Sequence, residues 1–121
     1  MNVLILEKRL SESLVYDIDC SPSLAANETI TAVATPTADN GGVTFGVPVS
    51  NSVPVTYPDG VTAGVGKVVQ VRITGGVIPA GSTLPDGRPG LRCTLRGDYT
   101  TAPQNNTREW TVLLDLTDTP A

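Results

Sequence analysis

The amino-acid sequence predicts a single all-β domain in which two sheets pack against each other. Twelve glycines and ten prolines occur in 121 residues, and such frequent breakers favour short strands joined by turns over long helices. Apolar and polar residues alternate in several segments, as they do in a strand with one buried face. Aromatic residues make up only 4% of the chain, so Val, Leu, Ile and Ala are expected to form most of the core.

The beginning of the chain predicts two strands. Residues 2–6 contain the apolar run Val3-Leu4-Ile5-Leu6, which indicates a short edge strand that packs on the body or pairs with a neighbouring subunit. The charged residues 7–12 are expected to form a loop. In residues 14–20 every second residue faces the core, which is the periodicity of a strand. These inward residues are Leu14, Tyr16, Ile18 and Cys20.

Turn signals divide the middle of the chain into short strands. Residues 29–35 are expected to form one strand, and Asp39-Asn40-Gly41-Gly42 then marks a tight turn. Further short strands are expected at residues 43–47 and 53–57. In the strand predicted over residues 29–35, the inward face consists of Ile30, Ala32 and Ala34.

The second half of the chain predicts three cleaner strands. Residues 67–74 and 91–96 alternate clearly, and residues 108–116 form the final strand. Residues 77–90 are rich in proline and glycine and predict a long loop, while residues 97–106 are polar and resemble a turn. The predicted inward residues are Val69, Val71, Ile73, Leu91, Cys93, Leu95, Trp110, Val112 and Leu114.

These elements amount to about seven strands at roughly regular spacing, the number expected of an immunoglobulin-like β-sandwich. Residues 1–121 are therefore interpreted as one such domain. Residues 2–6 would form its N-terminal edge strand, and residues 117–121 a short C-terminal tail.

Composition excludes several classes of function. The formal net charge is −4 and the Lys and Arg residues form no cluster, so we expect no nucleic-acid partner. No apolar stretch is long enough to span a membrane, and the first apolar run is too short for a secretion signal. The chain has no histidine, which rules out His-based triads and His-containing zinc sites. We therefore expect neither an enzyme nor a cofactor.

Two cysteines are predicted on inward strand faces. Cys20 and Cys93 could meet across the core and form a disulfide, as in antibody domains. Because no secretion signal is evident, two buried free thiols are the favoured interpretation.

Acidic residues cluster early in the sequence. Asp17 and Asp19 share one strand face and Glu12 lies nearby, so this group could bind calcium or transfer protons. No calcium-loop pattern follows, and a solvated strand face is the favoured interpretation. The two aspartates could also form salt bridges with Arg92 or Arg96.

Residues 8–21, residues 67–76 and Arg108-Glu109 carry the most distinctive patterns of the chain. Together these three parts resemble the fiber–tail adaptors, a family of small phage structural proteins. Residues 67–76, which end in Gly75-Gly76, are similar to one strand of that family, and Arg108-Glu109 to the start of its last strand. Cys20 stands where the family pattern has tryptophan. The resemblance implies an immunoglobulin-like fold and a structural role that bridges the phage tail to its fibers. The residues that resemble the family's opening are Lys8, Glu12, Leu14, Tyr16, Asp17, Ile18, Asp19 and Ser21.

The expected function is therefore non-enzymatic attachment within a bacteriophage virion, after synthesis in the cytoplasm of the bacterial host. The partners would be other phage structural proteins, namely the tail hub or tube and the fiber, in a symmetric multi-copy assembly. The alternative is a capsid decoration or cement protein of the phage head. A carbohydrate-binding surface domain is a third class, disfavoured by the scarcity of aromatic residues that could stack on sugars.

Six residues are candidates for contact with a partner. Val3, Leu4, Ile5 and Leu6 form the expected edge strand, whose unpaired backbone groups invite strand addition. Tyr57 and Arg88 lie on loops, and long loops in small domains often carry function. An ordinary solvent-exposed loop with one cation is an equally supported interpretation for Arg88. No catalytic, cofactor-binding or metal-binding residue is predicted.

Overall fold

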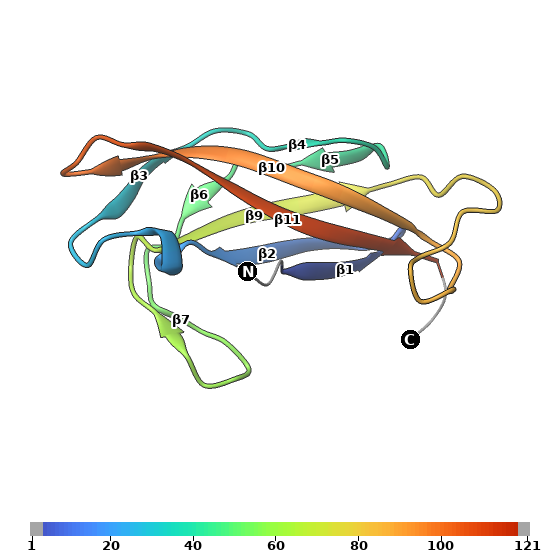
Figure 1. Ribbon diagram of the computed structural model, residues 1–121, viewed down its shortest axis with the longest axis horizontal. Helices are drawn as coiled ribbons and strands as arrows, with labels where there is room; N and C mark the ends of the chain where they lie inside the picture. The colour runs from blue at the N-terminus through green and yellow to red at the C-terminus, as the bar shows by residue number, and fades with distance from the viewer. Residues whose placement is uncertain (1–3, 119–121) are drawn as a thin grey trace.

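The computed structural model describes residues 4–118 and shows an all-β protein. Two sheets face each other across one core, and a small two-stranded hairpin projects from the body (Figure 1). The only helical element among the described residues is the short 3-10 turn Ser21–Ser23. The prediction of an all-β fold is therefore confirmed.

The first sheet is mixed and has the strand order β1-β11-β10-β3. Its two long strands, β10 (Leu91–Ala102) and β11 (Thr107–Thr117), form an antiparallel hairpin. Strand β1 (Ile5–Arg9) pairs in parallel with the second half of β11, from Leu113 to Thr117. Strands β3 (Thr29–Val33) and β4 (Thr37–Ala38) both pair with β10 on its other side.

The second sheet is antiparallel throughout. Strand β9 (Val68–Gly75) lies at its centre and pairs with β2 (Ser13–Asp19) on one side. On the other side it pairs with β5 (Val43–Phe45) and β6 (Val49–Ser50). The projecting hairpin is formed by β7 (Val55–Thr56) and β8 (Thr62–Ala63), and residues 52–66 are called the arm below.

The core lies where the inward faces of the two sheets meet, and it is mostly aliphatic, as the composition predicts. The alternation predicted for β9, β10 and β11 is confirmed, with Leu91 at the start of β10 only half-buried. For β2 it is confirmed at Ile18 and, half-buried, at Tyr16, but it is wrong for Leu14, which is 37% exposed. Two aromatic side chains, Tyr99 and Trp110, join the core at one end. The buried members are Ile18, Cys20, Ile30, Val69, Val71, Ile73, Cys93, Leu95, Tyr99, Trp110, Val112, Leu114 and Leu116.

The predicted loop at residues 7–12 is wrong in its first half, because β1 runs on to Arg9. The Lys8 side chain lies inside the protein, where its ammonium donates hydrogen bonds to the carbonyl oxygens of Arg9, at 2.8 Å, and Gly75, at 2.6 Å. A buried charge is tolerated where hydrogen-bond acceptors surround it, so the charged sequence does not prevent a strand. The edge strand predicted for residues 2–6 is therefore shifted toward the C-terminus in the described chain.

The predicted turn at residues 97–106 and the predicted tail from residue 117 are also wrong in part. Strand β10 continues to Ala102 and β11 continues to Thr117, so only the chain between them forms a turn. Inside this stretch Tyr99 and Thr101 are buried, and Gly97 faces the indole of Trp110. The polar composition of residues 97–102 does not indicate a strand. These residues form one because of contacts with elements that are distant in the sequence.

The inward face predicted for residues 29–35 is wrong for Ala32 and Ala34, which are exposed. The register between β3 and β10 shifts at Thr100 and Thr101, so β3 carries one extra residue there. Such a bulge reverses the side-chain alternation beyond it. Ile30 therefore points into the core while Val33, rather than Ala32, packs against it.

Candidate functional site

The predicted contact strand forms one edge of the first sheet. Val3 lies outside the described residues. The Leu4 and Ile5 side chains are 47% and 46% exposed, whereas Leu6 packs against the core. The Leu113 amide donates a hydrogen bond to the Leu4 carbonyl at 3.0 Å, which attaches the start of this segment to β11. Among the described residues no strand pairs with the other side of β1, and this open side is called the β1 edge.

The β1 edge is held rigidly from behind. The buried Lys8 ammonium connects β1 to the end of β9, and burial lowers the pKa of that ammonium. The Tyr16 hydroxyl of β2 donates to the Glu7 carbonyl at 2.7 Å. Both contacts join the first sheet to the second. Because backbone groups alternate along a strand, the Glu7 carbonyl and the Arg9 amide point to the β1 edge. The Glu7 carbonyl accepts from Tyr16 and the Arg9 amide donates to the Glu12 carboxylate at 2.8 Å, so the chain itself bonds the second half of this edge.

The structure brings Arg88 to the same edge. Its guanidinium pairs with the Glu7 carboxylate of β1 at 2.9 Å and with the Asp86 carboxylate of its own loop at 2.7 Å. The Arg88 side chain remains 46% exposed. The predicted long loop is confirmed between β9 and β10, where residues 77–90 contain only one isolated bridge, and it folds back against β1.

Tyr57 lies apart from β1 on the arm. Its phenol oxygen is buried and has no hydrogen-bond partner among the described residues. Burial, followed by the charges of Asp19 and Asp17, raises the pKa of Tyr57 to about 12. The Tyr57 hydroxyl thus points toward the end of β2.

The base of the arm is fixed by Asn51, a buried residue whose side-chain amide both donates and accepts hydrogen bonds. Its Nδ2 donates to the carbonyls of Val53 and Gly64, at 2.8 and 2.9 Å. Its Oδ1 accepts from the backbone amides of Lys67 and Val68, at 3.1 and 3.0 Å. Both strands leading into the arm are therefore joined at one side chain. Beyond this point the arm exposes three apolar side chains, namely Val53, Val61 and Val65.

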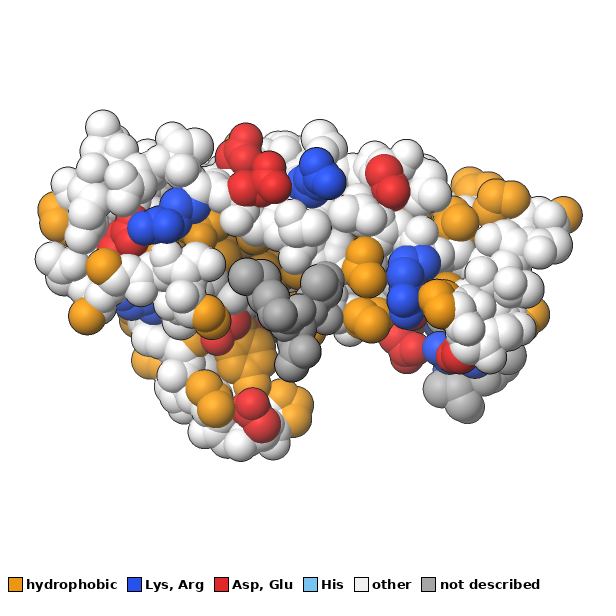
Figure 2. Space-filling model, in the orientation of Figure 1, with side chains coloured by type: hydrophobic (Ala, Val, Ile, Leu, Met, Phe, Trp, Pro, Cys, Tyr) orange, Lys and Arg blue, Asp and Glu red, His pale blue; other side chains and the backbone are white. Residues whose placement is uncertain are grey.

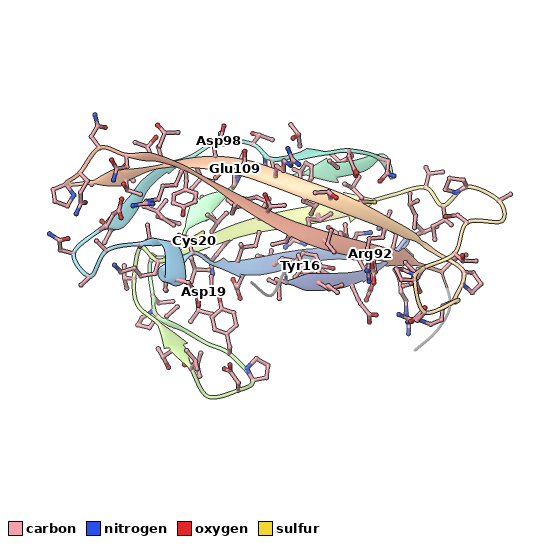
Figure 3. All side chains as sticks on the ribbon, in the orientation of Figure 1. Tyr16, Asp19, Cys20, Arg92, Asp98 and Glu109 are labelled. Atoms are coloured by element: carbon pink, nitrogen blue, oxygen red, sulfur yellow. The ribbon has the colours of Figure 1, made fainter. Side chains whose placement is uncertain are left out.

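A hollow of about 480 Å³ lies at the end of β2 beside β11. Figure 2 shows that the molecule is hollowed between the arm and the body, and Figure 3 shows Asp19 and Cys20 at the end of β2 next to the arm. Most of the surface inside the hollow is apolar, and Asp19 and Glu109 are its two carboxylates. Its lining residues are Leu4, Ile18, Asp19, Cys20, Pro22, Ser23, Tyr99, Glu109, Trp110, Thr111 and Val112.

Sequence reasoning did not identify this hollow. It placed Trp110 in the core, where the structure also has it. One feature of the sequence could have indicated it, namely the difference in length between two predicted strands. The final strand, residues 108–116, was predicted over nine residues, and the strand that pairs with it, residues 2–6, over only five. A long strand beside a short one leaves part of its edge uncovered.

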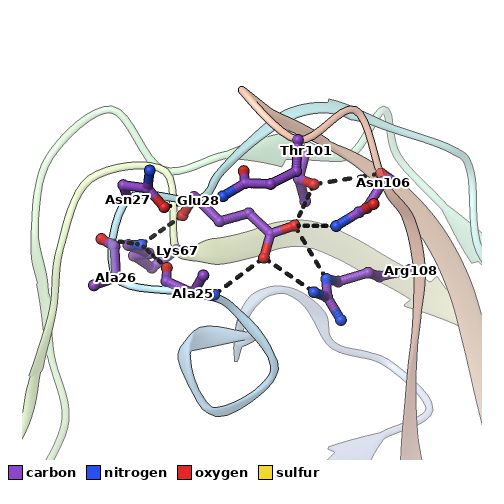
Figure 4. Close-up of polar contacts among 9 residues, drawn as sticks. Ala25, Ala26, Asn27, Glu28, Lys67, Thr101, Asn106 and Arg108 are labelled. Atoms are coloured by element: carbon purple, nitrogen blue, oxygen red, sulfur yellow. Dashed lines mark hydrogen bonds and ion pairs between the residues drawn. The ribbon is translucent and has the colours of Figure 1, made fainter.

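A buried charged cluster beside the turn between β10 and β11 joins strands (Figure 4). The Glu28 carboxylate accepts hydrogen bonds from the Ala25 amide, the Thr101 hydroxyl, the Asn106 amide group and the Arg108 guanidinium. The Arg108 and Thr101 hydrogen bonds are the main reasons that the pKa of Glu28 falls to about 2. Every oxygen of this carboxylate is occupied, so the cluster offers no free group for chemistry.

The remaining candidate residues are also occupied or buried. Cys20 and Cys93 are buried free thiols, and burial raises the pKa of each to about 11. Asp17 accepts from the Gln70 amide and Asp19 from the Ser21 backbone amide, whereas Arg92 pairs with Asp115. The predicted salt bridges of these aspartates with Arg92 or Arg96 are therefore wrong, since none is formed within residues 4–118.

Within residues 4–118, no group of three or more Cys, Asp or Glu side chains is arranged to hold a metal ion. The same residues include no helix with the length and apolar character needed to cross a membrane.

Comparisons of the chain with protein-family models, with curated proteins and with solved structures find no match.

Proposed function

We propose that this chain is a non-enzymatic structural protein of a bacteriophage virion, an adaptor that joins tail and fibers through protein–protein contacts. The observation that carries the proposal is the β1 edge, on which no strand of residues 4–118 pairs, together with the half-exposed apolar side chains of Leu4 and Ile5 at its start. Open strand edges readily add a strand from another chain, and soluble proteins usually cover or charge them.

The fold is in keeping with an immunoglobulin-like β-sandwich, which is the second part of the proposal. Seven strands of the described chain have three or more residues, and they form two sheets around one core. Domains of this kind present loops and edges on a stable body and serve as attachment modules on many surfaces.

A multi-copy arrangement would strengthen modest contacts. Several copies around a symmetric tail would each contribute one β1 edge, and the linked contacts would bind more tightly than any single one. The exposed pair Arg88–Glu7 beside this edge would then add orientation more than affinity, because exposed ion pairs contribute little.

We expect Ile5→Asp to block incorporation into virions while the isolated chain stays folded. The aspartate places an unpaired charge on the contact edge, and its cost should lower association at least about tenfold. Complementation of a phage that lacks the gene, followed by quantification of the chain in purified particles, measures this effect.

The matched control is Val47→Asp, which adds the same charge at a valine that is 88% exposed between β5 and β6. Both variants should unfold within about 0.5 kcal/mol of the parent chain. Equal incorporation of the two variants would refute the assignment of the contact to β1, and unfolding of Ile5→Asp alone would place Ile5 in the core.

Cryo-electron microscopy of purified virions tests the location. Density in a low-symmetry ring where fibers attach supports the adaptor function. Density over the icosahedral shell, at hundreds of copies, would instead identify a decoration protein of the head. Absence of the chain from virions would refute both structural functions.

A further inference from the structure

Within residues 4–118, pairing strands cover only half of the outer edge of β11. This strand spans Thr107–Thr117, but its parallel partner β1 begins opposite Leu113. No strand of the described chain pairs with β11 on this side between Thr107 and Val112. The Leu113 amide points to this side, since it donates to the Leu4 carbonyl. Because backbone groups alternate along a strand, the amides and carbonyls of Glu109 and Thr111 point to the same open side.

The hollow lies directly beside this open stretch. Glu109, Trp110, Thr111 and Val112 belong both to the uncovered part of β11 and to the hollow's lining. Its volume of about 480 Å³ falls within the range of roughly 300–1,000 Å³ found for ligand pockets. A strand added along β11 would therefore direct alternate side chains into the hollow, where apolar surface is available to receive them.

The charge around the hollow is negative. Among its lining residues are the carboxylates of Asp19 and Glu109, and none is a lysine or arginine. Neither carboxylate forms a salt bridge within the described chain. Asp19 accepts a hydrogen bond from the Ser21 amide, and Glu109 accepts a long one, at 3.4 Å, from the Thr111 hydroxyl. Glu109 faces outward on β11 and is exposed, so a cation on the outer face of an added strand would reach it.

The same charges argue against a second copy of this chain at the β11 edge. Two antiparallel β11 strands paired through Thr107–Val112 would bring the Glu109 and Asp19 carboxylates of both copies together. Like charges at one interface suppress association. A partner with cationic side chains fits this edge better.

We propose that the open edge of β11 and the hollow beside it bind one extended segment of a partner protein as an added strand. In that segment apolar residues alternate with lysine or arginine. The apolar side chains enter the hollow toward Trp110, and the cations lie on the outer face near Glu109. The inference rests on the proposed attachment function, which it deepens by naming the chemistry of the partner.

The test selects the segment from a displayed library of random 12-residue peptides, with the full chain as bait. We expect enriched peptides in which Val, Ile or Leu alternate with Lys or Arg. Their affinity is then measured by fluorescence anisotropy against variants of the chain.

Thr111→Pro removes one outward amide without removing a bond to β10, and it should weaken binding at least tenfold. Thr111→Val keeps that amide and should bind within about threefold of the parent chain.

A second variant tests the charge independently of the backbone. Glu109→Gln should weaken the same peptides severalfold at low salt, and the difference should shrink as the salt concentration rises. Because Glu109 is exposed, this variant stays informative if Thr111→Pro does not fold, which the emission of the lone Trp110 reports.

Several results would overturn the inference. These are enrichment of acidic peptides, absence of any binder, or equal binding to Thr111→Pro and Thr111→Val. Binding that occurs only after removal of residues 1–3 would identify the chain's own N-terminal segment as the occupant. The location in virions is a separate measurement, so a chain found at the tail that binds no such peptide refutes the inference and leaves the proposed function standing.

Discussion

Replacing Glu28 with glutamine should lower the midpoint of thermal unfolding by roughly 5–15 °C, because the buried carboxylate loses its charge while its donors, among them the partly exposed Arg108 guanidinium, remain. The carboxylate accepts from Ala25, Thr101, Asn106 and Arg108, and it holds the segment before β3 against the β10–β11 hairpin. Glutamine keeps one acceptor oxygen and turns an NH₂ group toward other donors. The Arg108 guanidinium then loses its countercharge.

The matched control is Glu109→Gln, which makes the same substitution on the exposed face of β11. It should change the free energy of unfolding by no more than about 0.5 kcal/mol. Calorimetry of both variants beside the parent chain separates the loss of the buried contacts from the general effect of one fewer negative charge.

The effect of Glu28 should also depend on pH. Its hydrogen bonds hold the pKa of the folded carboxyl near 2, below its ordinary value of 4.5. A lowered pKa means that the contribution is fully present above pH 4.5 and is lost as the pH falls toward 2. Urea unfolding between pH 7 and pH 2.5 should therefore show the parent chain and Glu28→Gln converging in stability. A constant difference across this range would show that the ionised carboxylate is not what stabilises the cluster.

Gly97→Ala is the second large expected effect, since it disturbs the one tryptophan of the chain. A Cβ atom at Gly97 would lie 2.5 Å from Nε1 of Trp110 and 2.6 Å from two of its ring carbons, so the indole must move. Overpacking of this kind costs about 1–3 kcal/mol. Chemical denaturation measures the cost, and Trp110 emission should shift to longer wavelength as the indole moves toward the hollow.

Gly64→Ala is the control for the loss of glycine itself. Its Cβ would meet only the Lys67 side chain, at an ordinary contact distance of 3.9 Å. This variant should stay within about 1 kcal/mol of the parent chain and keep its emission spectrum. If Gly97→Ala kept the stability and the emission of the parent chain as well, the close contact between Gly97 and the indole would be refuted.

Local alternation predicted the central strands well. The inward residues of β9, such as Val71, and those of β11, such as Val112, follow from a period of two that needs no knowledge of distant residues. The positions where strands end were harder to predict, because they depend on contacts with residues that are distant in the sequence. Lys8 can lie in β1 because the Gly75 carbonyl accepts a hydrogen bond from its ammonium, and Gly97 can lie in β10 because the Trp110 indole packs against it.

Some features of the candidate site could also be predicted from the sequence, and others could not. An exposed apolar run near the N-terminus and a long loop with Arg88 were predictable from composition and spacing. The ion pair between Arg88 and Glu7 was not, since 81 positions separate the two residues. Tyr57 was expected on an accessible loop, and it lies on one, but the fold turns its hydroxyl inward toward Asp19.

The sequence by itself determined the all-β class, the inward faces of the long strands and the lack of histidine chemistry, because these depend on residue type and short-range periodicity. Only the tertiary structure decided which strand edges stay open. An edge is open or covered according to how far its neighbour extends, and that depends on pairing between segments distant in the chain. An example is β11, which the described strands cover over half of its length, beside a hollow whose two carboxylates form no salt bridge within residues 4–118.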